Sequence, residues 1–490
     1  MLGLRQWGML ALLVWAVATF LVLHRGPFGI EEEAAKALLL DWSVADHVAN
    51  SIVTLGVPDF RDLLWLPLGF LWPGQVMAAK GVMIALAALT AWGLYRWQSL
   101  EGQDEAALLA TGLWLLTPLT LLQIDHLSPG LGILAAFMGG YWLDRSYRQR
   151  PHALGGLYFG QLGLVAFAVS LHPVGLVYPL LLAWTWHKNP VNSLQKKSFF
   201  IGLTVFSGIS ILLRWGWSGV LWFQNPVRDW APFWRHFPGF EPEVTATDWG
   251  AGVLILALVL WVWWHKRQML WKTLLGQCLW WGVLVSSFNG DATFALLGMI
   301  TLLYAGIPAL LEWGAGKIGF LAQRGWVLLG VFLISTLSMQ DDRAWFELGQ
   351  ARQLTEQDQL ILTLTQTVEH YRADAETRHL PDPRLRVASQ WPARTMLACR
   401  CDALPLPPAA KDPAAQLVMM KGLTHLIMAP KTPANLGLAQ NLSLLGNEVE
   451  TISLQAGGVV LQIRTPNLAP AAPAPVLDEP PPPAPGDPVK

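Results

Sequence analysis

The chain is poor in charged residues. Lys, Arg, Asp and Glu together make up 14% of its 490 residues, and hydrophobic residues make up 53%. A soluble protein of this size carries about 25% charged residues, so a soluble globular fold is not expected. The formal net charge of −1 indicates no particular partner, and no basic tail points to nucleic acid.

Cysteine is also scarce. Cys278 lies in an apolar run, and Cys399 and Cys401 are separated by a single residue, which is too close for easy disulfide geometry. We therefore expect packing residues or free thiols at these positions. No CxxC motif and no His/Cys cluster in the sequence suggests a metal site.

Long apolar runs take the place of the missing charges. We count about eleven that could cross a bilayer, because about 20 apolar residues in a helix span roughly 30 Å of hydrocarbon. The first is read as a retained span, since no clear signal-cleavage site follows it. The prediction is a mainly α-helical, polytopic membrane bundle. The approximate limits are 7–23, 77–95, 106–123, 129–143, 155–170, 173–186, 199–213, 251–264, 273–288, 293–312 and 325–339.

The distribution of Lys and Arg predicts the orientation. Basic residues gather in one set of loops, for example at Arg5, Arg145 and Lys266, whereas the short loops near Asp125 and His172 carry none. Basic loops are cytoplasmic as a rule. The N-terminus is therefore expected inside, and an odd number of spans places the C-terminal region outside. Two long loops, 24–75 and 214–250, also fall on the outer side, where long loops are usually functional.

Three consecutive acidic residues, Glu31, Glu32 and Glu33, begin the first long loop, within "GPFGIEEEAAKALLLDW". The segment 30–41 favours an amphipathic helix along the membrane surface. Successive residues on a helix are about 100° apart, so the three carboxylates fan out rather than face one way. Two interpretations remain open: a solvated first turn of a helix, which the helix dipole favours, or a catalytic carboxylate at the membrane edge.

The motifs around this loop resemble those of a known family. After the glutamates come Gly56, Pro58, Phe60 and Arg61, and then an apolar turn before the second span. An acidic pair followed by a "G-x-P-x-F-basic" stretch resembles the GT-C superfamily of integral-membrane glycosyltransferases. The similarity is to the bacterial branch related to protein O-mannosyltransferases and lipid A aminoarabinose transferases. "SLHPVGLVYPLLL", with His172 in a basic position, resembles that family's turn between two spans.

The resemblance implies a chemistry. Such enzymes move a sugar from a polyprenyl-phosphate carrier to a lipid, glycan or protein acceptor on the outer face of the bacterial inner membrane. One of Glu31 to Glu33 would be the general base for the acceptor hydroxyl. Cations would stabilise the phosphate leaving group, and a divalent metal is possible, although we assign it no ligands. The candidate substrate-binding residues are Arg61, Asp125, His126, His172, Arg214, Arg228, Arg235 and His236.

The composition changes after the last apolar run. We take 1–340 as the transmembrane part, 341–465 as a small α/β domain on the periplasmic side and 466–490 as a disordered Pro-rich tail. Helices are expected over 355–377 and 434–445, and strands over 384–389, 424–428, 448–454 and 458–463.

Two other functions remain open at this stage. A transporter or flippase should carry ionisable residues within its spans or two corresponding broken halves, whereas the charges here gather in two outer loops. A non-catalytic membrane assembly protein should tolerate Glu→Gln changes at all three glutamates. The membrane lipid is an expected partner in every case.

Overall fold

A computed structural model describes most of the helices and the C-terminal sheet. The described residues are 4–23, 28–30, 32, 34–36, 38–39, 75–99, 104–149, 154–188, 193–218, 257, 260, 264, 272–288, 294, 297–306, 308, 356–379, 385–429, 435–446, 448–455 and 458–464.

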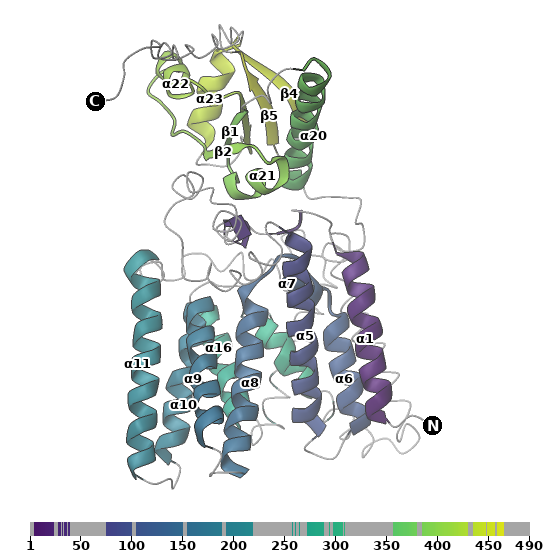
Figure 1. Cartoon of the computed structure of the whole chain (residues 1–490), viewed down its shortest axis with the longest axis vertical. Coiled ribbons are helices and arrows are strands. Elements are labelled where there is room, and N and C mark those ends of the chain that lie inside the picture. The colour runs from purple at the N-terminus through teal and green to yellow at the C-terminus, as the bar shows by residue number, and fades with distance from the viewer. Residues whose placement is uncertain are drawn as a thin grey trace, which may run out of the picture. The chain divides into compact units, whose positions relative to one another are not determined.

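The chain divides into two compact units, which we call the helical unit and the sheet unit. The helical unit comprises Met1–Leu362 and Trp391–Arg400, and the sheet unit comprises Thr363–Gln390 and Cys401–Lys490. The described part of the helical unit consists of helices (Figure 1). They are α1 (Leu4–Val22), α5 (Val76–Gln98), α6 (Asp104–Leu116), α7 (Pro118–Asp125), α8 (Pro129–Gln149), α9 (Leu154–Leu171), the short 3₁₀ helix η3 (Pro173–Leu176), α10 (Val177–Lys188), α11 (Ser193–Ser218), α16 (Leu274–Phe288) and α21 (Pro392–Cys399).

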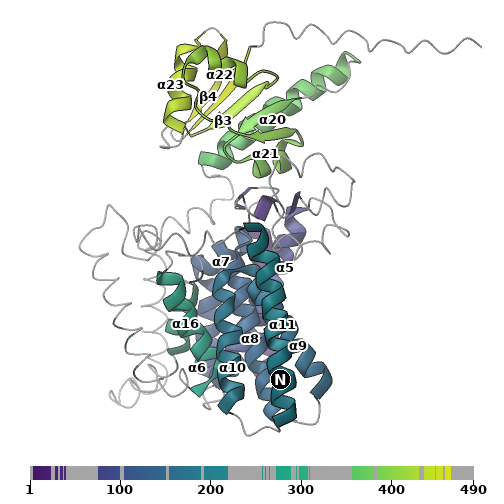
Figure 2. The ribbon, with the colours of Figure 1, turned by 90° about the vertical axis from the view of Figure 1, so that its left-hand side faces the viewer.

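Apolar composition and close contacts hold the helices together. Helix α5 packs on α1, α6, α7 and α8, and α9 packs against both α8 and α11 (Figures 1 and 2). A side chain at Gly93 of α5 would collide with Met138 of α8, and one at Gly140 of α8 would collide with Tyr178 of α10. These two glycines therefore set how closely α8 approaches its neighbours.

Buried side-chain hydrogen bonds fix the positions of the helices along one another. The Trp114 indole donates to the hydroxyl of Thr301 over 3.0 Å, and Trp15 donates to the Leu115 carbonyl over 3.2 Å. Thr117 donates to the Tyr304 hydroxyl over 3.0 Å. Because an unmade buried hydrogen bond is costly, these pairs favour one arrangement of the bundle over others with the same apolar contacts.

One helix of the described part, α5, is long and apolar enough to cross a membrane. Shorter apolar helices are described at 8–21, 106–116, 157–171, 197–209, 274–286 and 297–306. The predicted spans at 251–264 and 325–339 lie largely or wholly outside the described residues. The total of about eleven spans therefore stays a prediction, while the mainly helical architecture is confirmed.

The sheet unit holds a five-stranded sheet in the order β2-β1-β3-β5-β4. Strands β1 (Arg386–Ser389), β2 (Asp402–Pro405) and β3 (His425–Met428) run parallel, and β5 (Gly458–Ile463) pairs antiparallel with both β3 and β4 (Val449–Gln455). Strand β5 thus lies between β3 and β4. A register shift in β4, between Thr451 and Ser453, interrupts its pairing with β5. Helices α22 (Pro413–Met419) and α23 (Leu436–Leu444) belong to this unit, and α20 (Glu356–Thr377) crosses the boundary between the units.

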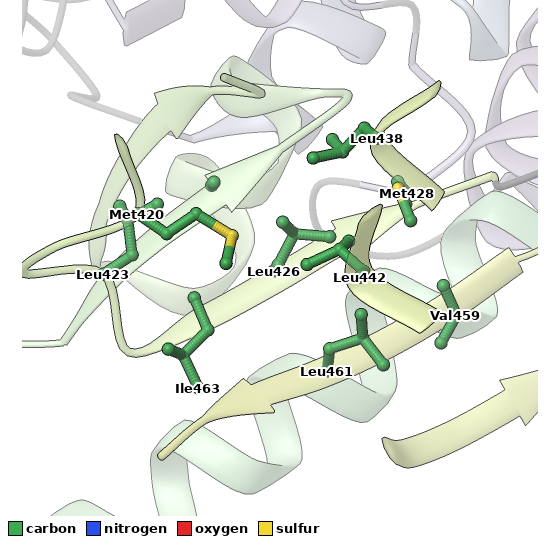
Figure 3. Close-up of a cluster of buried hydrophobic side chains, with 10 residues drawn as sticks. Met420, Leu423, Leu426, Met428, Leu438, Leu442, Val459, Leu461 and Ile463 are labelled. Atoms are coloured by element: carbon green, nitrogen blue, oxygen red, sulfur yellow. The ribbon is translucent and has the colours of Figure 1, made fainter. Parts of the chain in front are cut away.

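The core of the sheet unit is apolar. Side chains of β3, β5, α23 and the turn after α22 pack together (Figure 3). The turn bends at Gly422, whose φ of 86° suits glycine. The cluster comprises Ala388, Met420, Leu423, Leu426, Met428, Leu438, Leu442, Val459, Leu461 and Ile463.

Most elements of the sheet unit agree with the prediction, and two details do not. The helix expected at 355–377 and the strands expected near 386, 425, 449 and 458 are confirmed. Strand β2 was not predicted, because "DALP" is short and ends in proline. The expectation of packing residues or free thiols at Cys399 and Cys401 is wrong, because both are disulfide-bonded. Arg400 between them has a left-handed backbone conformation, with φ 53°. Cys278 is free and buried.

Candidate functional site

A buried ion pair lies near the beginning of α5. The Lys80 ammonium is 2.6 Å from a carboxylate oxygen of Asp125, and neither side chain is exposed. Lys80 also donates to the carbonyl of Phe28 over 3.0 Å. The end of α7 and the start of the first loop therefore share one cation, and the ion pair fixes where the glutamate segment leaves the bundle.

A second buried pair adjoins the same loop. One carboxylate oxygen of Asp358 accepts the amide of Gly29 over 3.3 Å, and the other pairs with the guanidinium of Arg394. The Arg394 side chain donates also to the Gln357 side chain over 3.0 Å. Gly29 has φ 77°, which glycine adopts at no steric cost. The first loop is thus tied to the beginning of α20 as well as to α5.

Glu32 caps a helix that is distant in sequence. Its two carboxylate oxygens accept the amides of Ala393 and Arg394, over 2.8 and 3.1 Å, at the beginning of α21. The first amides of a helix lack partners within the helix and carry the positive end of its dipole, so an anion is favourable there. Pro392 at the first position of α21 has no amide hydrogen. The first amides that need a partner are therefore those of Ala393 and Arg394, which Glu32 accepts.

Burial changes the proton affinity of Glu32. Desolvation raises the pKa of this carboxyl from 4.5 to about 6, against the opposing effect of the two amide bonds and of the Lys36 and Arg394 charges. A carboxylate with a pKa near 6 is a better proton acceptor than an exposed one. Each carboxylate oxygen has a second lone pair, so Glu32 can still accept a further hydrogen bond.

These contacts form one continuous set, which we call the buried charge network. It runs from Glu32 through the backbone and side chain of Arg394 to Asp358, and on through Gly29 and Phe28 to Lys80 and Asp125. Its members come from the first loop, α5, α7, α20 and α21, all within the helical unit. The network by definition comprises Glu32, Lys80, Asp125, Asp358 and Arg394.

The structure places the other predicted site residues in different settings. His126 is the C-cap of α7, and its amide donates to Leu122 over 2.8 Å. His172 is the N-cap of η3, where its Nδ1 accepts the Val174 amide over 3.3 Å. Arg214 belongs to α11. Of the predicted set, the network brings together Glu32 and Asp125. Glu31, Glu33, Arg61, Arg228, Arg235 and His236 lie outside the described residues.

Sequence reasoning missed three members of the network. A lysine within an apolar run, with an aspartate at the end of another, is a signal that could have singled out Lys80 and Asp125 as a pair. Asp358 and Arg394 carry no such local signal. Arg394 contacts Glu32 across 362 positions of sequence, and Asp358 contacts Gly29 across 329, so only the tertiary structure reveals these contacts.

The carboxylates of the network do not fit a divalent metal. Asp125 is neutralised by Lys80, Asp358 by Arg394, and Glu32 holds two helix amides. A metal site needs carboxylates that are free to turn their oxygens toward the ion. Within the described residues, no group of three or more His, Cys, Asp or Glu side chains is placed to bind a metal.

Comparison with solved structures identifies the architecture. ArnT from Cupriavidus metallidurans, bound to undecaprenyl phosphate, superposes with a TM-score of 0.57 at 12% identity, over 94% of this chain and 98% of that one. The oligosaccharyltransferase AglB from Archaeoglobus fulgidus, in complex with an inhibitory peptide and a dolichol-phosphate, has a TM-score of 0.53 at 10% identity, over 91% and 73%. The chain therefore shares the fold of these two proteins. The predicted resemblance is thereby confirmed for the fold. No family model and no curated protein matches the sequence.

Proposed function

We propose that the protein is a membrane glycosyltransferase that moves a sugar from a polyprenyl-phosphate carrier to a lipid, glycan or protein acceptor. The GT-C fold supports a transferase, and the two compared structures contain undecaprenyl phosphate and a dolichol-phosphate, respectively. Helix α5, which could cross a membrane, supports a membrane location.

The observation that carries the proposal is the position of Glu32. The central glutamate of the acidic triplet is held at least partly buried at the start of α21, beside Arg394, and joins a network that includes Asp125. A triplet that served only solubility would extend into water. The anchored position of Glu32 supports the proposal that one carboxylate of the triplet meets the acceptor.

The proposed reaction assigns each group a role. The acceptor hydroxyl gives its proton to a carboxylate oxygen of the triplet while its oxygen bonds to the anomeric carbon of the sugar. The bond from that carbon to the phosphate oxygen of the carrier breaks, and the phosphate leaves with the electron pair. Arg61, Arg228, Arg235 and His236 are proposed to stabilise this anion. Lys80 and Asp125 hold the first loop in place.

We propose that the reaction takes place on the outer face of a bacterial inner membrane, with the N-terminus in the cytoplasm and the sheet unit in the periplasm. The Lys and Arg distribution supports this orientation. The disulfide-bonded state of Cys399 and Cys401 agrees with an oxidising compartment.

The test is transfer by the purified full chain in lipid nanodiscs, supplied with a panel of undecaprenyl-phosphate-linked sugars and a lipid, glycan and peptide acceptor. We expect Glu→Gln at one of positions 31 to 33 to reduce the rate by about 100-fold or more, as the loss of a general base does. The matched control is Glu369→Gln, an exposed glutamate on α20. Full activity of the triple Glu→Gln variant, or no transfer by the wild type, would contradict the proposal.

One observation favours a second candidate, a transporter or flippase. Lys80 and Asp125 form a fully buried ion pair in the helical unit, and transporters place paired ionisable groups in such positions. The same nanodisc protein, moved into liposomes, distinguishes the two. Movement of a labelled lipid-linked sugar across the bilayer, without any transfer product, would favour the transporter.

A further inference from the structure

A groove on the helical unit lies apart from the buried charge network. Helices α5, α8 and α9 enclose it, with a volume of about 720 Å³, which falls within the range of small-molecule sites. Apolar side chains such as Leu86, Ala135 and Phe167 line its length, while Arg96 and Trp142 stand at one end. At its edge, Leu89 is 66% exposed and Trp92 is 36% exposed. The groove is therefore apolar along its length and cationic at its end.

Two arginines share one indole at that end. The guanidinium carbons of Arg96 and Arg145 are 5.9 and 5.7 Å from the ring centroid of Trp142, within the distance of a cation–π contact. Arg145 donates also to the Tyr141 hydroxyl over 3.4 Å. Within the part of the chain that the structure describes, neither guanidinium has a carboxylate partner.

The contrast with the other buried cations of this unit is informative. Lys80 and Arg394 are each neutralised by an aspartate. Arg96 and Arg145 are half-buried and have no carboxylate partner among the described residues, so they leave a local excess of positive charge in this part of the structure. Such a pair suits a phosphate, because charged hydrogen bonds from arginine to phosphate are short and strong.

The position along α5 fits the far side of a membrane. Arg96 follows Lys80 by 16 residues on the same helix (96 − 80), which is about 24 Å at 1.5 Å per residue. The arginine end of the groove therefore lies near the membrane surface opposite the network. Tryptophan and arginine both concentrate at such surfaces, and the basic loops assign this one to the cytoplasm.

We propose that this groove binds one anionic phospholipid, with an acyl chain along α5, α8 and α9 and the phosphate at Arg96 and Arg145. Anionic lipids attract basic clusters at the cytoplasmic surface, and basic pockets between helices hold their head groups. In a zwitterionic lipid, an ammonium group of the head group offsets the charge of the phosphate. The two arginines therefore favour a lipid with net negative charge. The inference rests on the proposed membrane location and is independent of sugar transfer.

Native mass spectrometry of the full chain in mild detergent tests it, with phosphatidylglycerol and phosphatidylcholine of identical acyl chains as probes. We expect one saturable site that prefers phosphatidylglycerol. In the Arg96→Ala and Arg145→Ala double variant, the affinity for phosphatidylglycerol should fall by about 30-fold, toward that for phosphatidylcholine, given the usual effect of each arginine at a membrane surface. The matched control is Arg386→Ala with Arg464→Ala, two exposed arginines of the sheet unit.

A groove-filling variant tests the apolar part separately. Ala135→Phe leaves both arginines in place and should reduce the binding of both lipids. Equal wild-type affinity for the two lipids, or an equal loss in the arginine variant and its control, would overturn the proposal. Stronger, arginine-dependent binding of undecaprenyl phosphate at this site would also overturn it in favour of the carrier. Because lipid binding is measured directly, the outcome for the lipid-site proposal does not depend on the outcome of the transfer assay.

Discussion

The two units of the molecule differ in where their ion pairs lie. In the helical unit, the ion pairs Lys80–Asp125 and Arg394–Asp358 are buried, with side-chain exposures of 0% and 0%, and of 7% and 1%. In the sheet unit, the ion pairs are exposed, as in Arg464–Glu450 with 62% and 50%. The buried side-chain cluster around β3 and β5 is instead made of apolar residues.

This difference suggests that apolar packing stabilises the sheet unit, whereas buried ion pairs position segments of the helical unit. An apolar core is stabilised in proportion to the area it buries, and the exposed pairs around it contribute little. A buried ion pair adds little net stability compared with apolar residues of the same size, but breaking it is costly. We infer that the buried pairs of the helical unit hold Phe28, Gly29 and Glu32, which belong to the described part of the first loop, in a defined place.

The largest effect is expected at Lys80. The Lys80→Met change leaves Asp125 buried without a cation and should lower the free energy of unfolding by about 3–5 kcal/mol. Thermal unfolding of the purified protein in one detergent measures this loss. The double variant Lys80→Met with Asp125→Leu should recover most of the stability. If the pair positions the loop, it should not recover the proposed sugar transfer. Full stability in the single variant would contradict the comparison.

A comparable effect should arise from packing alone in the sheet unit. The Leu426→Ala change in β3, at a fully buried position, should cost about 3 kcal/mol through lost contacts and a cavity. Hydrogen exchange should show the loss in β3 and β5 and not in α5. Val418→Ala, at a position that is 73% exposed, is the control. An equal increase in hydrogen exchange in both units would show that the two units do not unfold independently.

Acid should weaken the sheet unit through His425. Burial lowers the pKa of this imidazole from 6.5 to about 4. The unfolded chain therefore takes up a proton below about pH 6.5 and the folded chain does not, so stability falls with pH over this range. Between pH 7 and 5 we expect a loss of about 2 kcal/mol, measured as the free energy of unfolding of the sheet unit. The slope should vanish in His425→Leu.

Acid should have the opposite effect in the helical unit through Glu32. Its pKa is raised from 4.5 to about 6, so the folded state binds the proton more tightly, and this contribution to stability is present at low pH and lost as pH rises through 6. Between pH 7 and 5 the gain should be about 1 kcal/mol. The unfolding free energy of Glu32→Gln should lack this dependence, and an unchanged slope in the variant would refute the assignment.

The smallest effect is expected at the exposed ion pairs. Arg464→Ala, which removes the 2.8 Å bond to Glu450, should change the free energy of unfolding by less than about 1 kcal/mol, and less still at high salt. A loss as large as that of Lys80→Met would remove the distinction between the two units.

Local patterns predicted many elements, but only two of the five residues of the buried charge network, Glu32 and Asp125. Helix α20 and strands β1, β3, β4 and β5 follow from amphipathic or apolar runs with clear turn residues, whereas β2, at "DALP", has no such run. The acidic triplet was singled out as a candidate from its position beside an apolar run, and its catalytic role stays a prediction. The partners of Glu32 did not, because Ala393 and Arg394 lie 361 and 362 positions away.

What the sequence by itself determined is the kind of protein: a helix-rich, membrane-like chain with acidic residues at the edge of its first apolar run, followed by a small α/β segment. Hydrophobicity and charge act locally, so they can be read in a window of about 20 residues. Only the tertiary structure decided which charges meet. The free energy of a buried charged group depends on the groups within a few ångströms, and for Glu32, Lys80 and Asp358 those groups come from segments that are far apart in the chain.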